Sequence, residues 1–192
     1  MTTVVQRPPG NEAPAPELGM YHAHDHGQVA VLNGMFAVFQ VGDMTLPTGQ
    51  RINSVRVPDI TTATYEMPMV LNDAGTIGLS LNGKSFPATA PVAMKPGESL
   101  LLHYYNEGLQ PHPMHLHHVP QLVVAKDGFP LVQPYLADTV MVGPGERYSV
   151  LVLPTSADLG VWAWHCHILT HAENDDGHFG MVTALIVDDK AS

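Results

Sequence analysis

Residues 164–171 read Trp-His-Cys-His-Ile-Leu-Thr-His, and the cysteine at position 166 is the only one among 192 residues. A lone cysteine is usually a small core residue, but that reading leaves the three surrounding histidines, His165, His167 and His171, unexplained. Residues i and i+2 of a β-strand face the same side. We therefore expect His165 and His167 to point together and Cys166 to point to the opposite face. A thiolate among imidazoles predicts a site for a soft cation.

The rest of the chain has the pattern of an all-β protein. Short runs rich in β-branched and aromatic residues alternate with turn signals such as Asn-Asp-Ala-Gly at 72–75 and Lys-Pro-Gly-Glu at 95–98, and no long helical stripe interrupts them. This spacing is typical of an antiparallel sandwich or barrel. The predicted strands are Val29–Leu32, Phe36–Val41, Ile77–Leu81, Ser99–Tyr105, Leu122–Ala125, Val140–Val142, Tyr148–Leu153 and Met181–Val187.

Composition narrows the function classes. Hydrophobic residues make up 45% of the chain and charged residues 14%, so a substantial core can form, and the net charge of −10 argues against nucleic acid as a partner. The longest apolar runs, such as 100–102 and 184–187, are too short to span a membrane. One cysteine excludes an intrachain disulfide, so cysteine pairing does not indicate a redox compartment.

The N-terminal segment, residues 1–17, is expected to be a flexible leader. It is rich in proline and shows no hydrophobic periodicity. It also lacks a basic start followed by an apolar stretch, so it does not have the pattern of a secretory signal. The compartment stays open, because the pattern fits either a cytoplasmic protein or a chain without its natural N-terminus.

An internal repeat predicts the domain organisation. Residues 18–38 and 159–181 both run from Leu-Gly through an aromatic residue to His-x-His, and both place a glycine ten residues after the second histidine. The second copy closes a run of predicted strands that starts near residue 70, whereas the first copy has almost nothing before it. We therefore expect closing strands of an incomplete first domain at 18–46, a linker at 47–69 and a complete C-terminal domain at 70–192.

Most of the twelve histidines lie in three segments, which are 22–26, 112–118 and 165–171. By strand alternation, His115 pairs with His117 and His22 pairs with His24, as His165 pairs with His167. One thiolate with two imidazoles is the trigonal donor set of a blue-copper site, whereas clustered His-x-His pairs make an all-nitrogen site for copper or zinc. The sequence therefore predicts two metal centres on opposite faces of one strand, joined through the backbone at 165–167.

Two of these segments, His-Pro-Met-His-Leu-His at 112–117 and His-Cys-His-Ile-Leu-Thr-His at 165–171, resemble the paired copper motifs of the multicopper oxidases, the laccase family. The resemblance covers about Leu18 to Val187 and implies cupredoxin-like Greek-key β-sandwiches with copper as cofactor. It implies that the mononuclear type 1 copper is bound by His112, Cys166 and His171. It further implies that the type 2 copper is bound by His115 and the type 3 pair by His117, His165 and His167.

The first repeat matches the second His-x-His of the family's first domain. The resemblance thus implies that His22 and His24 are cluster ligands, and that Ala23, in the place of the cysteine, leaves that domain without a type 1 copper. The family's trinuclear cluster uses eight histidines from four His-x-His pairs, and this chain shows three pairs. The fourth is expected from another copy of the chain in a homo-oligomer, from a partner chain or from a longer parent protein.

The axial ligand of the type 1 copper has two candidates. In the family a methionine usually follows the last histidine of the second motif by five residues, and that position is Asp176 here. The repeat aligns His178 with Met35, which favours His178. The usual thioether chemistry favours Met181.

The remaining histidines have ordinary structural interpretations. We expect His103, in Leu-Leu-His-Tyr-Tyr, to be a strand residue hydrogen-bonded to its neighbours. His26 and His118 are expected to face solvent or to support the ligands.

The resemblance implies a laccase-like oxidoreductase. Single electrons would come from a phenol, an aromatic amine or a low-valent metal ion at the type 1 copper, pass through Cys166 to His165 and His167, and reduce dioxygen to water at the trinuclear site. Two other functions stay open, a mononuclear blue-copper electron carrier with an incomplete trinuclear site and a zinc-binding or structural domain. The number of copper ions bound per functional unit distinguishes these three functions.

Overall fold

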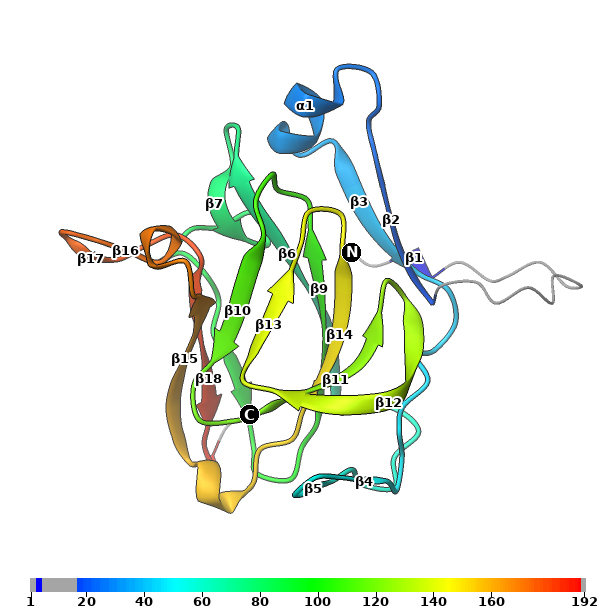
Figure 1. The fold of residues 1–192 in the computed structure, drawn as a ribbon. Coiled ribbons are helices and arrows are strands. Elements are labelled where there is room, and N and C mark those ends of the chain that lie inside the picture. The colour runs from blue at the N-terminus through cyan, green and yellow to red at the C-terminus, as the bar shows by residue number, and fades with distance from the viewer. Residues whose placement is uncertain (1–2, 5–16, 191–192) are drawn as a thin grey trace, which may run out of the picture.

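The chain folds into a β-sandwich, with a smaller N-terminal layer packed on one side (Figure 1). The computed structural model describes residues 3–4 and 17–190. Most of the predicted leader therefore lies outside the described residues, as does the C-terminal pair 191–192. Within the described part, no helix is both long enough and apolar enough to cross a membrane.

Two sheets form the sandwich. The five-stranded sheet has the order β13 (Thr139–Val142), β10 (His112–Leu116), β15 (Gly160–Cys166), β18 (Val182–Val187) and β8 (Val92–Met94). The six-stranded sheet has the order β12 (Phe129–Ala137), β11 (Gln121–Lys126), β14 (Arg147–Val152), β9 (Leu100–Asn106), β6 (Tyr65–Ala74) and β7 (Gly78–Leu81). Neighbouring strands are antiparallel except β6 with β9 and β18 with β8, which are parallel. The all-β sandwich predicted from the sequence is confirmed.

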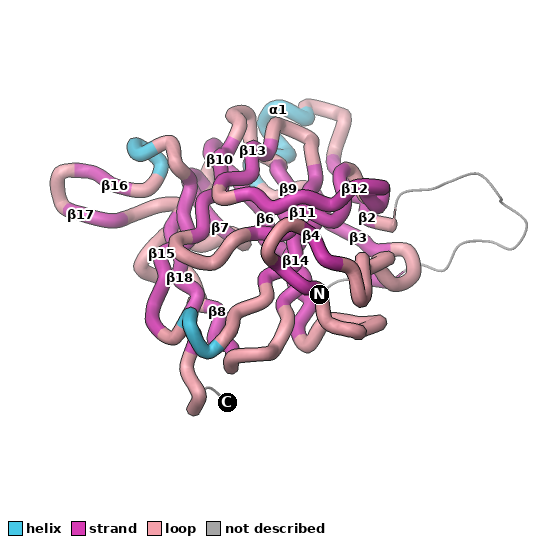
Figure 2. The backbone as a smooth tube through the Cα atoms, turned by 60° about the horizontal axis from the view of Figure 1, so that its bottom comes forward, coloured by secondary structure: helices cyan, strands magenta, loops and turns pink. Residues whose placement is uncertain are grey.

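Three small sheets and four short helices complete the described chain. The small sheets are β1 (Thr3–Val4), β3 (Phe36–Gln40) and β2 (Leu18–His22), then β4 (Arg51–Ile52) with β5 (Val55–Arg56), and β16 (Glu173–Asn174) with β17 (Gly177–His178). The helices are α1 (Gly27–Ala30) and three single 3₁₀ turns, η1 (Val31–Asn33), η2 (Ser156–Asp158) and η3 (Leu169–His171). Figure 2 shows the β16–β17 hairpin projecting away from the two main sheets.

One predicted strand is a helical turn instead. Val29–Leu32 lies in α1 and η1, where the Asn33 side-chain amide donates to the Val29 carbonyl at 2.7 Å and Gly34 ends the turn with φ of 98°. Four apolar residues in a row cannot distinguish a strand from one helical turn, and here the local Asn33 and Gly34 contacts favour the turn. The other predicted strands match observed strands to within one or two residues at their ends.

The core lies between the two sheets and is built by side-chain alternation. Met114 and Leu116 of β10 are buried against Trp164 and Cys166 of β15 and against the inner face of the six-stranded sheet. Three polar side chains of this core are paired with one another: Trp164 Nε1–H donates to the Tyr104 hydroxyl, which donates to Gln121 Oε1, both at 2.6 Å. Apolar packing and these hydrogen bonds hold β10 and β15 in one register.

A second apolar layer lies on the other face of the six-stranded sheet. Leu18, Met44 and Val57 are buried there, and they pack against sheet residues that include Leu101, Tyr105, Leu122 and Leu151. Residues 18–63 therefore cover a sheet face that would otherwise be exposed. β6 begins at Tyr65, so the predicted boundary at residue 70 falls inside a strand, and the predicted linker contains the short β4–β5 hairpin.

Candidate metal centre

The pairing of β10 with β15 creates two groups of metal-binding side chains on opposite faces of one sheet. Met114 is opposite Cys166, and His115 is opposite His165. Because neighbours alternate in facing, Cys166 points into the core while His115 and His165 lie on the outer face of the sheet. This arrangement matches the prediction that Cys166 and its flanking histidines face opposite sides of the strand.

The inner group consists of three buried side chains. Cys166 and His112 are fully buried and His171 is 6% exposed. Cys166 Sγ lies 3.7 Å from His112 Nδ1 and 3.6 Å from His171 Nδ1. One donor atom from each residue lies within 4.8 Å of the others, so the three can surround a single ion. A thiolate and two imidazole nitrogens are the donor set that suits copper in a trigonal site.

Burial shapes the protonation of this group in the metal-free protein. Burial raises the pKa of the Cys166 thiol to about 11. Burial also lowers the pKa of His112 and of His171, and the nearby Asp73 carboxylate partly opposes both shifts. The site at neutral pH therefore offers two neutral imidazoles and a protonated thiol, and a bound metal ion must displace the thiol proton.

The two candidates for the axial ligand lie in different surroundings. Met181 is fully buried in the same core cluster as Cys166. Its carbonyl accepts a hydrogen bond from the Cys166 N–H at 3.0 Å, and its own N–H donates to the His171 carbonyl at 2.9 Å. His178 is exposed on β17 and meets the Phe86 ring edge-on at a centroid distance of 6.4 Å. Asp176 is exposed in the turn of the same hairpin.

The outer group consists of four histidines from the two adjacent strands and the residues that follow them. Five of the six ring pairs among His115, His117, His165 and His167 have centroid separations of 4.8 to 5.6 Å. The predicted pairs His115–His117 and His165–His167 thus share one face. Burial lowers the pKa of both His117 and His165, and repulsion from the neighbouring imidazoles adds to the effect.

Hydrogen bonds to the chain orient two of these rings. His165 Nδ1 lies 2.9 Å from the Cys166 carbonyl, and His115 Nδ1 lies 3.1 Å from the Asp138 carbonyl. A carbonyl only accepts, so each Nδ1 carries the proton and each Nε2 keeps its lone pair. His165 Nε2 lies 3.1 Å from His117 Nε2. Without a metal ion, the two Nε2 atoms either repel each other or share a proton. A cation bound between them would remove the repulsion or take the place of that proton.

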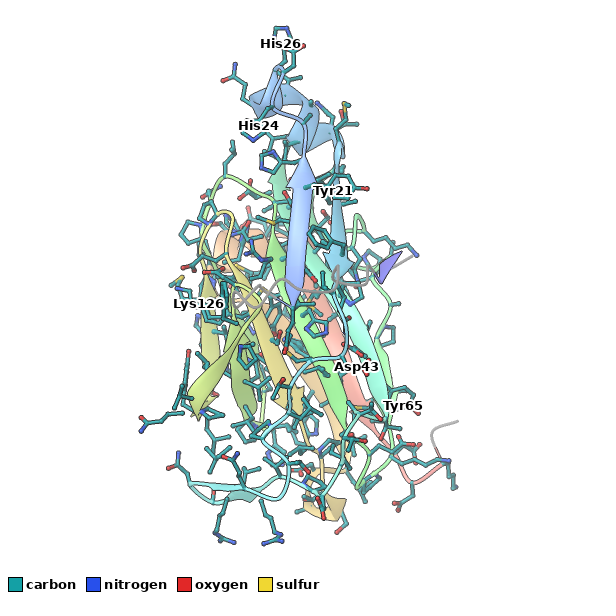
Figure 3. All side chains as sticks on the ribbon, turned by 90° about the vertical axis from the view of Figure 1, so that its right-hand side faces the viewer. Tyr21, His24, His26, Asp43, Tyr65 and Lys126 are labelled. Atoms are coloured by element: carbon teal, nitrogen blue, oxygen red, sulfur yellow. The ribbon has the colours of Figure 1, made fainter. Side chains whose placement is uncertain are left out.

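The third predicted pair lies elsewhere. His22 and His24 stack on each other at a centroid distance of 5.0 Å, and both are exposed. His24 and the neighbouring His26 lie at the tip of the N-terminal layer (Figure 3). Among the described residues, no ring contact joins His22 or His24 to the four-histidine group. One copy of the chain therefore brings together four of the six predicted cluster histidines.

The other histidines have structural contacts. His103 is buried, with Nδ1 2.9 Å from Ser149 Oγ and Nε2 2.9 Å from Glu66 Oε1, which confirms the expected hydrogen-bonded strand residue. His118 stacks on Trp162 and lies 3.1 Å from an Asp158 carboxylate oxygen. His26 is largely exposed.

Asp73 contacts the inner group, although the sequence marks it only as part of the turn signal at 72–75. Its side chain is 1% exposed and lies 3.1 Å from His112 Nε2. Its position 39 residues before His112 carries no local signal, because the contact depends on how the two sheets pack.

Comparison with known proteins places this geometry among copper proteins. The sequence model of a family described as Multicopper oxidase matches residues 52–191. Copper resistance protein A of Escherichia coli is 38% identical over 94 residues, which cover 49% of this chain and 15% of that protein. The laccase of Haloferax volcanii is 38% identical over 106 residues, which cover 52% of this chain and 18% of that protein.

Solved structures extend the likeness to nearly the whole chain. The blue copper oxidase from Nitrosomonas europaea has a TM-score of 0.71 and 28% identity, covering 91% of this chain and 57% of that one. A copper nitrite reductase from the same organism has a TM-score of 0.69 at 17% identity over 92% of this chain and 64% of that one, which is a likeness of fold alone. The matches span 15% to 20% of the length of the curated relatives.

Proposed function

Because the chain belongs to the multicopper oxidase family, whose cofactor is copper, we propose that it acts as a laccase-like oxidoreductase that uses dioxygen as electron acceptor. Bound copper supplies one-electron redox chemistry, so single electrons taken from a small reducing substrate accumulate for the four-electron reduction of dioxygen to water. The substrate is a phenol, an aromatic amine or a low-valent metal ion.

The observation that carries this proposal is the arrangement of Cys166 and its two neighbours. Cys166 lies with His112 and His171 on the inner face of the five-stranded sheet, and His165 lies with the other histidines on the outer face. One peptide unit joins Cys166 to His165 within β15, and one joins it to His167 directly after the strand. Such a covalent connection suits electron transfer from Cys166 to His165 and His167.

We assign the inner group to the type 1 copper and Met181 to its axial position. Support comes from burial, because Met181 lies in the core beside Cys166 whereas His178 is exposed on a projecting hairpin. A weak thioether ligand also fits the chemistry of blue copper.

We assign the outer group to the trinuclear cluster, with His115 on the type 2 copper and His117, His165 and His167 on the type 3 pair. His22 and His24 make no ring contact with this group within one copy of the chain, so the missing histidines come from a second copy, from a partner chain or from a longer parent protein. Exposed apolar side chains near His22 and His24, which are Tyr21 at 63%, Val29 at 58% and Met35 at 63%, provide a surface for such a partner.

The alternative function is a mononuclear blue-copper electron carrier. One observation favours it: within the described residues, only His112, Cys166 and His171 form a group of three donors close enough to share one ion. A zinc-binding domain without redox function is the third candidate.

Copper counting with a visible spectrum tests these assignments. We expect the copper-loaded protein to be blue from thiolate-to-copper charge transfer, with about four copper ions per functional unit for the oxidase and one for the carrier. Cys166→Ser should lose the colour and keep the fold, since a hydroxyl cannot supply the soft sulfur. His26→Ala, at an exposed histidine outside both groups, is the matched control and should stay blue. A colourless oxidised wild type would refute the type 1 assignment.

A further inference from the structure

We propose that Asp73 is a positioning residue for His112: its carboxylate fixes the ring so that Nδ1, with its lone pair, faces Cys166, and its charge stabilises the oxidised state of the bound copper. The inference rests on the proposed type 1 site. It concerns a residue that the copper motifs at 112–117 and 165–171 do not contain.

The contact joins the two sheets. Asp73 lies on β6 of the six-stranded sheet, and His112 begins β10 of the five-stranded sheet. Asp73 Oδ2 lies 3.1 Å from His112 Nε2, and the exposed fractions of the two side chains are 1% and 0%. The other ring nitrogen, Nδ1, lies 3.7 Å from Cys166 Sγ. Each nitrogen of the His112 ring therefore has one distinct neighbour.

This geometry selects one tautomer of the neutral ring. A carboxylate only accepts hydrogen bonds, so the ring proton lies on Nε2 and Nδ1 keeps its lone pair. The lone pair then points at the space shared with the thiol. A carboxylate behind a histidine ligand in this way orients the ring and makes it a stronger donor.

Asp73 is itself held in place from three sides. Its oxygens accept hydrogen bonds from the backbone N–H groups of Leu109, at 3.0 and 3.1 Å, and of Gln110, at 2.7 Å. Gly108 permits this approach, because a Cβ there would lie 2.6 Å from Asp73 Oδ2. Strand pairing of Asp73 with Leu79 fixes the backbone. The carboxylate therefore ties the loop before His112 to the neighbouring sheet and has no freedom to swing away.

The two histidines of the inner group are consequently different. His171 Nδ1 also faces the sulfur, at 3.6 Å, but no described carboxylate is hydrogen-bonded to its ring. A negative charge close to one imidazole in a buried site favours the more positive oxidised ion. Asp73 should therefore lower the reduction potential of the copper, and among the two histidines it is hydrogen-bonded to His112.

Asp73→Asn separates this effect from the loop contacts. An amide has nearly the same shape, and its oxygen can still accept from Leu109 or Gln110, but it carries no charge and its NH₂ group cannot accept the His112 proton. The matched control is Glu66→Gln. Glu66 lies on the same strand and contacts a histidine in the same way, at 2.9 Å from His103 Nε2, but that histidine is not among the proposed ligands.

The experiment measures the reduction potential of the copper-loaded protein by redox titration of the blue band, and its copper(II) affinity. For Asp73→Asn we expect the ratio of copper(I) to copper(II) binding constants to rise about tenfold, a shift of about 59 mV for a one-electron couple, with copper(II) affinity about 10- to 100-fold lower. Glu66→Gln should change neither. A blue Asp73→Asn variant with the wild-type potential would show that Asp73 only holds the loop, and would overturn the proposal.

A second measurement needs neither copper nor a variant. Nitrogen-15 NMR of the metal-free wild type should show His112 as the Nε2–H tautomer, and a proton on Nδ1 would overturn the proposal. The two proposals fail separately: a colourless copper-loaded wild type refutes the type 1 site, while the tautomer of His112 still decides the role of Asp73.

Discussion

At the scale of single residues, the thiol of Cys166 controls how metal binding depends on pH. Burial raises its pKa to about 11, so the thiol is protonated at neutral pH and must lose its proton to bind a metal. His112 and His171 are already neutral there, because burial lowers the pKa of each. One proton should therefore be released per ion bound at this site.

We predict that the apparent affinity for cobalt(II), followed by its thiolate charge-transfer band, rises about tenfold for each pH unit between roughly pH 7 and pH 10. Cobalt is the suitable probe, because that band reports only on the cysteine site. The dependence should flatten as the pH approaches the pKa of the thiol. An affinity that does not change with pH, or that changes a hundredfold per unit, would contradict a single titrating thiol.

The axial ligand gives a second prediction at this scale. Met181→Leu should change the electron paramagnetic resonance spectrum of the type 1 copper and raise its reduction potential, because it removes a buried sulfur beside Cys166. His178→Leu should leave the spectrum at its wild-type form, since His178 is exposed on β17. The assignment is wrong if the spectrum responds to the His178 change and not to the Met181 change.

At the scale of secondary-structure elements, a buried histidine joins three strands. His103 on β9 contacts Ser149 on β14 and Glu66 on β6. The hydrogen bond from His103 lowers the pKa of Glu66, and burial opposes this only in part. A carboxyl whose pKa is lower in the folded state adds stability above its unfolded pKa, and that stability is lost as the pH falls through the folded pKa.

We predict that Glu66→Gln lowers the free energy of unfolding of the metal-free protein by about 0.5–1 kcal/mol at pH 7, because the Glu66 side chain is 40% exposed and solvent weakens the interaction. The difference from wild type should shrink as the pH falls below the unfolded pKa of about 4.3 and through the lower folded pKa, because the wild-type carboxyl then becomes neutral as well. Urea unfolding at pH 3 and pH 7 measures both values. Glu173→Gln, at an exposed carboxylate on β16, is the control and should be neutral at both. A difference that grows toward low pH would contradict the sign of the pKa shift.

At the scale of the whole molecule, the histidine groups do not converge within one chain. The four-histidine group lies on the five-stranded sheet, whereas His24 lies at the tip of the N-terminal layer beside exposed apolar residues (Figure 3). The family's trinuclear cluster uses eight histidine ligands, and this chain has six predicted ones. A complete trinuclear site therefore needs histidines from outside the chain.

We predict that the chain in isolation is oligomeric or prone to aggregate, and that it consumes little or no oxygen with a simple phenol. Apolar surface that stays exposed in one copy favours association. Mass in solution by light scattering, measured together with oxygen uptake, tests both statements. A monomer that reduces oxygen at an ordinary laccase rate would show that the six histidines suffice and that the proposed ligand count is wrong.

The features that can be predicted from the sequence are those that depend on local backbone geometry. A strand places successive side chains on opposite faces, so the order His-Cys-His is enough to separate Cys166 from His165 and His167. Turn residues and β-branched runs were likewise enough for the sandwich and for most strand boundaries. The same local reasoning misassigned Val29–Leu32, because four consecutive apolar residues carry no periodicity.

Contacts between side chains that are distant in the sequence depend on how the sheets pack. This packing places Asp73 against His112, buries Met181 beside Cys166 while leaving His178 exposed, and keeps His22 and His24 away from the four-histidine group. These relations join residues on different strands or in different layers, and they follow from how the sheets pack. The spacing of residues along a chain gives the direction of a side chain within its own strand, but the packing of the sheets determines which residue it faces.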